Sequence, residues 1–297
     1  MIILKYICLD IGGTTIKHAL ADETGQLTAK AQTPSRATVS GGIVDTVLNI
    51  VKESSAKETI NGVAIATAGL VDENDRVVFA GEHFADYSGT HLSAIVEENC
   101  HLPCTVINDA NAAALGEYWL GVGKGSKSMF MITVGTGVGG ALIIDGHIVN
   151  GSGCSAGEIG FIPLGDGVKL EDVASGSAMT RQIAAAKHIL PQDIGNKQIA
   201  TWIKNNDETT LGAIKSMCRA LSFGIATVCC LINPEVIVLG GGAMENETLM
   251  RPLLNKALAD RLPAPLYSST RLEFATLQND AGAVGALKYF LQCKAQV

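Results

Sequence analysis

A short apolar run, a glycine-rich turn and a second apolar run open the chain, and the same order returns near its middle. Short apolar runs bounded by turn residues predict strands at residues 6–9, 16–21 and 27–32 in the first copy, and at residues 129–134, 141–144 and 147–150 in the second. The intervening turns are Gly12-Gly13 and Gly135 to Gly140, and Asp145-Gly146 is a typical hairpin turn. One plan used twice indicates two similar domains.

Helical spacing alternates with further strand patterns after each copy. Helices are predicted at residues 43–53, 92–98, 110–120, 211–231, 249–261 and 281–291, and strands at residues 62–67, 105–107, 236–239 and 272–274. Such alternation predicts a mixed α/β fold with helix-covered sheets. We expect an N-terminal domain over residues 1–120, a C-terminal domain over residues 121–279, and a final helix within residues 280–297 that packs back on the first domain. Because small ligands favour domain interfaces, the glycine turns are expected to face a central cleft.

The composition excludes several classes of protein. The chain has 297 residues, of which 47% are hydrophobic, so it can bury two large cores. Its net charge of −7 and its lack of a Lys/Arg block disfavour nucleic acid as a partner. The first apolar run is too short for a signal peptide, and residues 225–232 are too few to cross a bilayer. Eight cysteines without an export signal indicate reduced thiols and a cytoplasmic location.

The first turn, Asp10-Ile11-Gly12-Gly13-Thr14-Thr15, joins two strands. A Walker P-loop and a dinucleotide fingerprint are therefore excluded, because both need a helix next. Glycines allow backbone N–H groups to approach phosphate oxygens, the Thr14 and Thr15 hydroxyls can donate, and Asp10 could orient Mg2+ through water. An ordinary glycine hairpin is the alternative. The repetition of the pattern as Thr136-Gly137-Val138-Gly139-Gly140 favours a phosphate site.

Asn108-Asp109 follows a predicted strand and precedes a predicted helix. A helix cap explains an acid at this place, because Asp is a good N-cap and its charge suits a helix N-terminus. The functional interpretation is a carboxylate that accepts the proton of an attacking hydroxyl. Phosphoryl transfer tolerates the weak basicity of such a carboxylate, because its loose transition state depends more on positioning.

Two further groups of residues follow the second turn. Gly240-Gly241-Gly242 comes at the carboxyl end of a predicted strand, where ligands commonly bind, although a tight strand–helix turn would need the same residues. Glu158 and Glu171 offer carboxylates that could accept hydrogen bonds from paired sugar hydroxyls. Ordinary surface acids are the alternative for both.

In this order the motifs resemble those of the ROK family (repressor, open reading frame, kinase), within the actin-like, hexokinase-type ATPase fold. The resemblance covers essentially the full length and implies two ribonuclease-H-like α/β domains with a central ligand cleft. It implies an ATP-dependent sugar kinase in which Asp109 deprotonates a sugar hydroxyl, usually at C6. Asn108, Glu158, Glu171 and Gly81 are then the sugar contacts. The turns at Gly12-Gly13 and Gly137 to Gly140 hold the ATP phosphates with Mg2+, and Gly240 to Gly242 lies by the adenosine.

Phe161 marks a departure from the family pattern. Most members carry a histidine at this position, in a Glu-x-Gly-His motif, followed by a cysteine-rich zinc loop. Residues 162–169 contain no cysteine, so we predict that the protein has no structural zinc and that the shorter loop is held by packing. Loss of the histidine removes one contact to a sugar hydroxyl, which leaves glucose, N-acetylmannosamine, fructose and β-glucosides open as substrates. Phe161 could stack on a sugar face or on a larger substituent.

Other functions remain possible on the same fold. Repressors of the family carry an N-terminal helix-turn-helix, for which the start of the first turn at Asp10 leaves no room. A non-catalytic sugar-sensing regulator and a chaperone-like ATPase are further alternatives, which the presence of Asp109 disfavours. The family resemblance implies a homodimer.

Overall fold

The computed structural model describes residues 4–81 and 84–295, which form two compact units. Unit 1 is built from parts of Met1–Gly125, Leu142–Ala156 and Thr276–Val297, and unit 2 from Ser126–Ala141 and Gly157–Ala275. Residues 142–156 thus group with unit 1, although the sequence pattern placed them in the C-terminal domain. The boundary at residue 120 stays a prediction.

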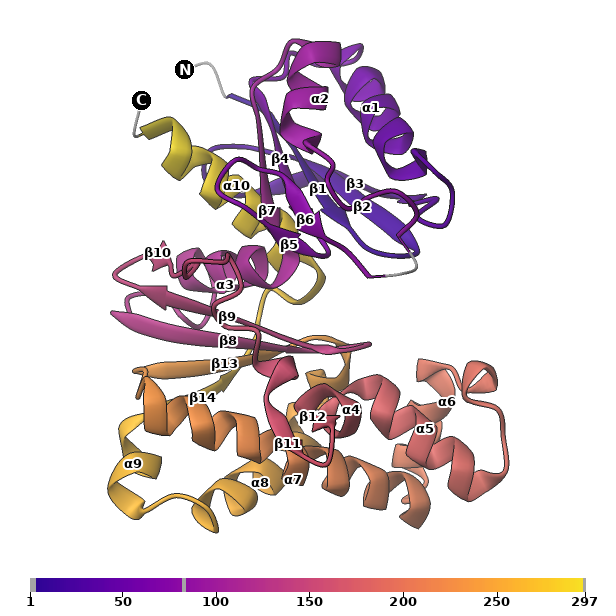
Figure 1. Cartoon of the computed structure of the whole chain (residues 1–297), viewed down its shortest axis with the longest axis vertical. Coiled ribbons are helices and arrows are strands. Elements are labelled where there is room, and N and C mark those ends of the chain that lie inside the picture. Colours follow the sequence, from indigo (N-terminus) through magenta and orange to yellow (C-terminus); the bar gives the residue numbers. More distant parts are fainter. Residues whose placement is uncertain (1–3, 82–83, 296–297) are drawn as a thin grey trace. The chain divides into compact units, whose positions relative to one another are not determined.

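Unit 1 contains a five-stranded sheet in the order β3-β2-β1-β4-β7 (Figure 1). Its strands are β1 (Tyr6–Ile11), β2 (Thr15–Ala21), β3 (Leu27–Pro34), β4 (Gly62–Thr67) and β7 (Cys104–Asn108). β1, β4 and β7 are parallel, and the register aligns Ile11 with Thr67 and Thr67 with Asn108. The first glycine turn and Asn108-Asp109 therefore lie at the same edge of this sheet.

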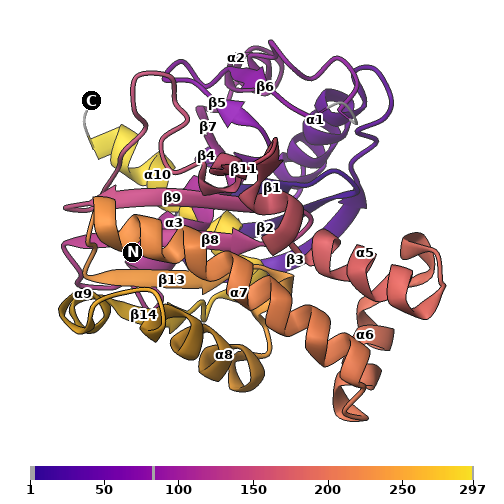
Figure 2. The same cartoon turned by 60° about the horizontal axis from the view of Figure 1, so that its bottom comes forward.

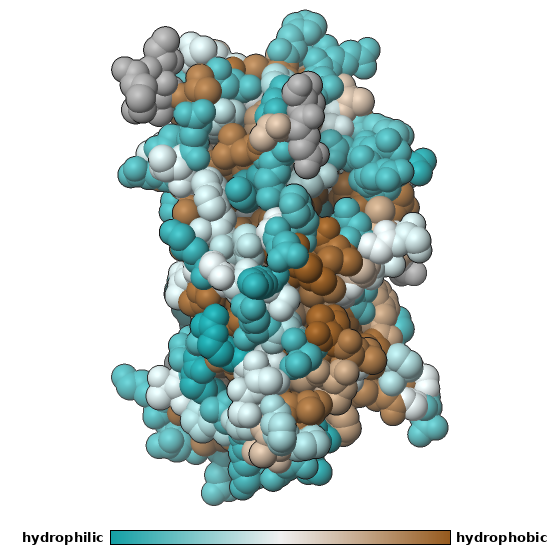
Figure 3. Space-filling model, turned by 90° about the vertical axis from the view of Figure 1, so that its left-hand side faces the viewer, coloured by the Kyte–Doolittle hydropathy of each residue, from teal (hydrophilic) through white to brown (hydrophobic). Residues whose placement is uncertain are grey.

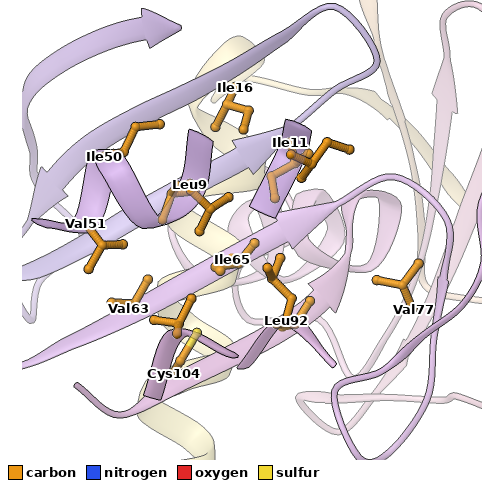
Figure 4. Close-up of a cluster of buried hydrophobic side chains, with 14 of the residues drawn as sticks. Leu9, Ile11, Ile16, Ile50, Val51, Val63, Ile65, Val77, Leu92 and Cys104 are labelled. Carbon is orange, nitrogen blue, oxygen red and sulfur yellow. The ribbon is translucent and has the colours of Figure 1, made fainter. Parts of the chain in front are cut away.

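Helices α1 (Gly42–Ser55) and α2 (Leu92–Cys100) cover one face of this sheet. Side chains alternate across a strand, so Ile7, Leu9 and Ile11 of β1 all project to that face. There they join Val47 and Val51 in one buried cluster, part of which Figure 4 shows. Strands and helices that lie far apart in the chain thus share a single apolar core.

The other face of the sheet carries α3 (Asp109–Trp119) and α10 (Ala281–Ala295), which lie against each other (Figure 1). The helices approach closely because both present glycine. A Cβ atom at Gly116 would lie 2.5 Å from the carbonyl oxygen of Ala281, and one at Gly285 only 1.6 Å from that of Ala112. The C-terminal helix is therefore an integral part of unit 1. Unit 1 also contains a short hairpin of β5 (Leu70–Val71) and β6 (Val77–Phe79).

The second sheet has the order β10-β9-β8-β13-β14. Its strands are β8 (Ser128–Val134), β9 (Val138–Ile144), β10 (His147–Ile148), β13 (Val236–Gly240) and β14 (Arg271–Phe274). β13 runs parallel to both β8 and β14. The carboxyl ends of β8 and β13 therefore meet at one edge, where the second glycine turn and the three-glycine segment follow them.

Helices make up most of the rest of unit 2 (Figure 2). They are α4 (Leu170–Ala174), α5 (Gly176–Lys187), α6 (Asn196–Lys204), α7 (Glu208–Leu231), α8 (Glu247–Ala259) and α9 (Ala264–Ser269). Helix α7 has the length and composition of a membrane span, but half of its apolar window is buried inside the protein. It contacts α4, α5 and α8, as expected of the core helix of a folded unit.

The sequence pattern misplaced the end of the second turn and missed several helices and short strands. The second turn does not extend to Gly140, because β9 already begins at Val138. Gly140 is buried in that strand, where a Cβ atom would lie 2.5 Å from the carbonyl oxygen of Gly157. Helices α5 and α6 and the β5–β6 hairpin were not predicted.

Exposed apolar side chains are scattered among polar ones on the face shown in Figure 3. The most exposed large apolar residues are Leu231, Leu190 and Phe79. They lie in different parts of the chain, and single exposed apolar residues of this kind are normal for a folded protein.

Candidate active site

Hydrogen bonds to its carbonyl oxygens hold the first glycine turn in place. Gly12 donates its N–H to the carbonyl oxygen of Thr15 at 3.0 Å and closes the turn. The fully buried Ser35, after β3, donates its N–H to the Thr14 oxygen at 3.0 Å and its hydroxyl to the Gly13 oxygen at 2.9 Å. Gly13 and Thr14 are exposed at the tip. The turn is thus fixed on one side and open on the other.

Asp10 lies one residue before the end of β1 and is half-buried. Its carboxyl group packs against Gly282 in the first turn of α10, where a Cβ atom would lie 3.1 Å from the carboxyl oxygen Oδ2. Burial raises the pKa of Asp10, and the charge of Lys17 acts in the opposite direction. A carboxylate beside a phosphate-sized turn has the chemistry to hold Mg2+ through water, since this ion keeps several waters when proteins bind it.

Asn108, and not Asp109, is the residue that caps helix α3. Asn108 is the N-cap of α3, and its Oδ1 accepts the N–H of Asn111 at 3.0 Å. Its amide nitrogen donates to the Gly69 carbonyl oxygen at 2.9 Å and to Asp109 Oδ1 at 3.1 Å. Asp109 is the first helical residue and is exposed, with Oδ1 accepting the N–H of Ala110 at 2.8 Å. Because Asn108 caps the helix, Asp109 is not needed as the cap.

The loop that contains Gly81 comes after β6. Gly81 is half-buried, and its carbonyl oxygen accepts the N–H of Phe84 at 2.9 Å. Phe84 stacks on Tyr87, whose hydroxyl is 2.8 Å from the Thr67 hydroxyl at the end of β4. This chain of contacts anchors the loop to the sheet edge that carries the glycine turn and Asp109.

The second glycine turn is joined to the start of α5. Gly135 accepts at its carbonyl oxygen the N–H of Gly176 at 2.8 Å, and its own N–H donates to Gly137 at 3.0 Å. Ser175 caps α5 by accepting the N–H of Ala178 at 3.1 Å. The turn therefore lies beside a helix N-terminus, which favours negative charge such as phosphate.

Glu158 and Glu171 come together on the other side of this turn. A Cβ atom at Gly137 would lie 2.8 Å from Glu171 Oε2, so glycine leaves the space that the carboxylate occupies. Burial raises the pKa of Glu158, and the nearby charge of Glu171 raises it further. Gly160 allows the Glu158 segment to press against β9, because a Cβ atom there would lie 2.1 Å from the Val138 oxygen. Two neighbouring carboxylates of this kind are strong acceptors for hydroxyl donors.

A pocket of about 460 Å³ opens next to the same turn. One end is formed by Gly135, Thr136, Gly176 and Ser177. The walls are mostly apolar and come from α5, α6, α7 and α8, with Met179, Ile199, Ile203, Ile214 and Met250 among them. A polar end at a helix N-terminus and apolar walls fit a nucleotide. The sequence pattern missed this set because α5 and α6 were not predicted.

The three glycines after β13 have different surroundings. Gly240 is buried in the strand, and a Cβ atom would lie 2.6 Å from the Met131 side chain. Gly241 has a φ of 87° and lies against the backbone of Val134. Gly242 begins a 3-10 turn (Gly242–Met244), lines the pocket and has open space at its Cβ position. Of the three, Gly242 is the one that faces a ligand-sized space, while Gly240, like Gly140, is a packing residue.

Phe161 lies in an exposed position, with half of its side chain open to solvent. The Lys169 ammonium lies 4.8 Å from the ring centroid, a cation–π contact. Residues 162–169 form a small hairpin of β11 (Pro163–Gly165) and β12 (Val168–Lys169), closed by the bond from Leu170 N–H to the Ile162 oxygen at 2.9 Å. Among the residues that the structure describes, no group of three or more His, Cys, Asp or Glu side chains is arranged to hold a metal ion.

Unit 1 thus carries Asp10, the first turn, Gly81, Asn108 and Asp109, and unit 2 carries the second turn, the acid pair and the pocket. Two mixed α/β units, each with a glycine turn in the hairpin that opens its sheet, define the actin-like ATPase fold. The crystal structure of a ROK family glucokinase from Streptomyces griseus in complex with glucose and AMPPNP matches with a TM-score of 0.83 and 29% identity, over 96% of this chain and 98% of that one. The predicted fold class is confirmed.

Sequence comparison gives the family. A model of the ROK family matches residues 6–293. A glucokinase from Halalkalibacterium halodurans is 30% identical over 308 residues, covering 94% of this chain and 93% of its own length. A beta-glucoside kinase from Listeria monocytogenes is 27% identical over 299 residues, covering 97% of this chain and 98% of its own length. The chain belongs to the ROK family and is a sugar kinase.

Proposed function

We propose that this kinase transfers the γ-phosphoryl group of ATP to the C6 hydroxyl of a hexose or hexose derivative. The observation that carries the proposal is the position of the turn at Gly135–Gly137. On one side Gly137 touches the carboxylate of Glu171, which has Glu158 nearby. On the other side Gly135 and Thr136 line the apolar pocket. A turn that borders an acid pair and a nucleotide-sized pocket fits the phosphate chain between sugar and nucleoside.

The proposed roles follow from chemistry. The open sides of the turns at Gly12-Gly13 and at Thr136-Gly137 offer backbone donors to phosphate oxygens. Asp10 would hold Mg2+ through water. When bound there, Mg2+ would offset the negative charge of the phosphate oxygens. Gly242 and the apolar walls of the pocket would hold the adenosine.

Asp109 is proposed as the general base that accepts the proton of the attacking hydroxyl. Its carboxylate is exposed at the start of α3, at the same sheet edge as the first turn. Asn108, Glu158 and Glu171 would hold the other sugar hydroxyls, with Gly81 beside them. Closure of the protein on the bound sugar would exclude water and limit ATP hydrolysis.

We infer the candidate sugars from Phe161, which stands where most members of the family have a histidine. Phe161 is exposed and covered in part by Lys169, so its ring is free to meet an acetamido group or an aglycone. N-acetylmannosamine, glucose and β-glucosides are therefore the candidate substrates.

A Phe161→His variant is expected to change the ratio of kcat/KM values between plain and substituted hexoses. An unchanged ratio would show that Phe161 does not contact the sugar.

Glu158→Gln is expected to raise the thermal stability of the protein at high pH and to weaken its affinity for the sugar. The pKa of Glu158 is raised, so its stabilising contribution is present when the carboxyl is protonated and is lost as pH rises through that pKa. Gln removes the buried charge, so the Tm of the variant should exceed that of the wild type at pH 8, and the difference should disappear toward pH 4. The KM for the sugar should rise at least about tenfold, because hydrogen bonds to a charged acceptor are the strong ones.

Glu98→Gln serves as the control, because Glu98 is an exposed residue of α2. Its Tm curve and KM should follow the wild type. A Glu158→Gln protein with an unchanged KM would contradict the assignment of Glu158 to the sugar.

ADP release from Mg-ATP against a panel of sugars tests the proposed reaction. The panel contains glucose, N-acetylglucosamine, N-acetylmannosamine, fructose, mannose, allose and cellobiose. A strong response to one sugar, with the product phosphorylated at C6, is expected. Tight sugar binding without ADP release would instead support the alternative, a non-catalytic sugar-sensing regulator.

Three further expectations belong to the same proposal. The protein is expected to act in the cytoplasm, to form a homodimer and to contain no structural zinc. The hairpin over residues 162–169 supports the last of these, because backbone hydrogen bonds close it although most of its side chains are exposed. Light scattering and metal analysis of the purified protein would test the oligomeric state and the zinc content.

A further inference from the structure

Asp10 has a basic residue directly opposite it in the sheet. The register of the antiparallel pair β1–β2 aligns Asp10 with Lys17. Side chains of directly opposed residues project from the same face, within reach of each other. The pair is therefore close enough for its charges to interact.

Helix α10 and the turn before it pack over Asp10 and Lys17 on one face of the sheet. The ring centroids of Tyr6, at the start of β1, and Phe290 are 5.4 Å apart, while Asp10 packs against Gly282. The four-residue step along β1 spans about 13 Å, and the eight-residue step along α10 spans about 12 Å. The helix therefore runs antiparallel to β1 at matched length. Its first turn falls on Asp10.

Lys17 is itself fixed from the same side. Its Nζ donates to Asn279 Oδ1 at 2.8 Å, and Asn279 belongs to the 3-10 turn η4 (Gln278–Asp280) just before α10. The next residue, Asp280, is paired with Lys30 of β3 at 2.6 Å. Two lysines from neighbouring strands thus reach adjacent residues of η4, but Lys17 is the one placed opposite Asp10.

We propose that Lys17 is a positioning residue that holds the Asp10 carboxylate in place for the metal–nucleotide complex. The inference rests on the proposed function, which assigns Asp10 to Mg2+. Without the ammonium group, a carboxylate pressed between Gly282 and the sheet would lose its charged partner and the direction in which it points. Lys17 would then act through Asp10, with no contact to the nucleotide of its own.

Calorimetric binding of Mg–AMPPNP to the full chain tests the inference without turnover. Lys17→Met should weaken binding about tenfold, because it keeps the alkyl stem but removes the charge. Lys17→Arg should restore most of the affinity. Lys30→Met is the matched control, since it removes a lysine bonded to the neighbouring residue of η4, and its affinity should equal that of the wild type.

A double-mutant cycle with Asp10→Asn shows whether Lys17 acts through Asp10. Lys17→Met should cost almost nothing further in the Asp10→Asn background, and its effect should disappear when AMPPNP is titrated in EDTA. Additive losses, or an equal loss without Mg2+, would overturn the inference. Wild-type affinity of a folded Lys17→Met protein would do the same. If no sugar supported ADP release while these binding effects were found, the assigned reaction would fail and the role of Lys17 would stand.

Discussion

Asp109→Asn should abolish sugar phosphorylation while leaving the fold intact. We expect kcat to fall by about 10²–10⁴-fold, the contribution typical of a general base. The fold should survive because Asn108, and not Asp109, caps α3. An asparagine oxygen can still accept the N–H of Ala110, so only the favourable charge at the helix N-terminus is lost, about 0.3–1 kcal/mol. Steady-state kinetics and a thermal melt measure the two effects separately.

Asp45→Asn is the matched control for this variant. Asp45 is an exposed acid in the first turn of α1, so its replacement makes the same change of charge at the start of a helix that carries no proposed site residue. It should lower the Tm by a similar small amount and leave kcat unchanged. An Asp109→Asn protein that is folded and keeps more than about a tenth of the wild-type kcat would exclude Asp109 as the base.

Gly285→Ala should cause the largest loss of stability among conservative changes in unit 1. The added Cβ would lie 1.6 Å from the Ala112 oxygen and 2.8 Å from the Gly116 nitrogen, both backbone atoms of α3 that cannot rotate away. The helices must separate, and overpacking of this kind costs about 3 kcal/mol. The Tm of the transition should fall by about 6–12 °C. Activity of the folded fraction should also fall, because α3 carries Asp109.

Gly212→Ala is the control for the helical glycine. Gly212 lies in α7 with open space around its Cβ position, so alanine should stabilise that helix by about 0.5–1 kcal/mol. Differential scanning calorimetry of both variants gives the comparison. Equal melting temperatures for Gly285→Ala and the wild type would show that α3 and α10 are not packed as closely as the structure has them.

The local pattern was sufficient for most of the sheet strands. Each strand of the two main sheets has a counterpart among the predicted segments, because the period of apolar positions is a local property of the chain. The pattern failed where composition hides the period. Helix α5 is rich in alanine and begins with glycine and serine, and α6 buries only Ile199 among its described residues, so neither has a long apolar stripe.

The residues of the candidate site likewise divide into those that the sequence could identify and those that it could not. The motifs at Asp10, Asp109 and Gly137 could be found as strings, because phosphate turns and helix starts have local signatures. The same strings could not show which of their glycines face a ligand and which are buried by packing. Gly242 faces the pocket, whereas Gly140 and Gly240 are buried against a carbonyl oxygen and a methionine side chain from distant parts of the chain.

The sequence by itself determined the strands of the two main sheets, the family and a set of candidate residues for phosphoryl transfer. Only the tertiary structure decided which of them meet. The approach of Glu158 to Glu171, the apolar walls of the pocket and the enclosure of Asp10 by α10 and Lys17 all join residues far apart in the chain. Local patterns report backbone conformation, whereas such contacts depend on how whole elements pack, through glycines whose missing side chains permit the approach.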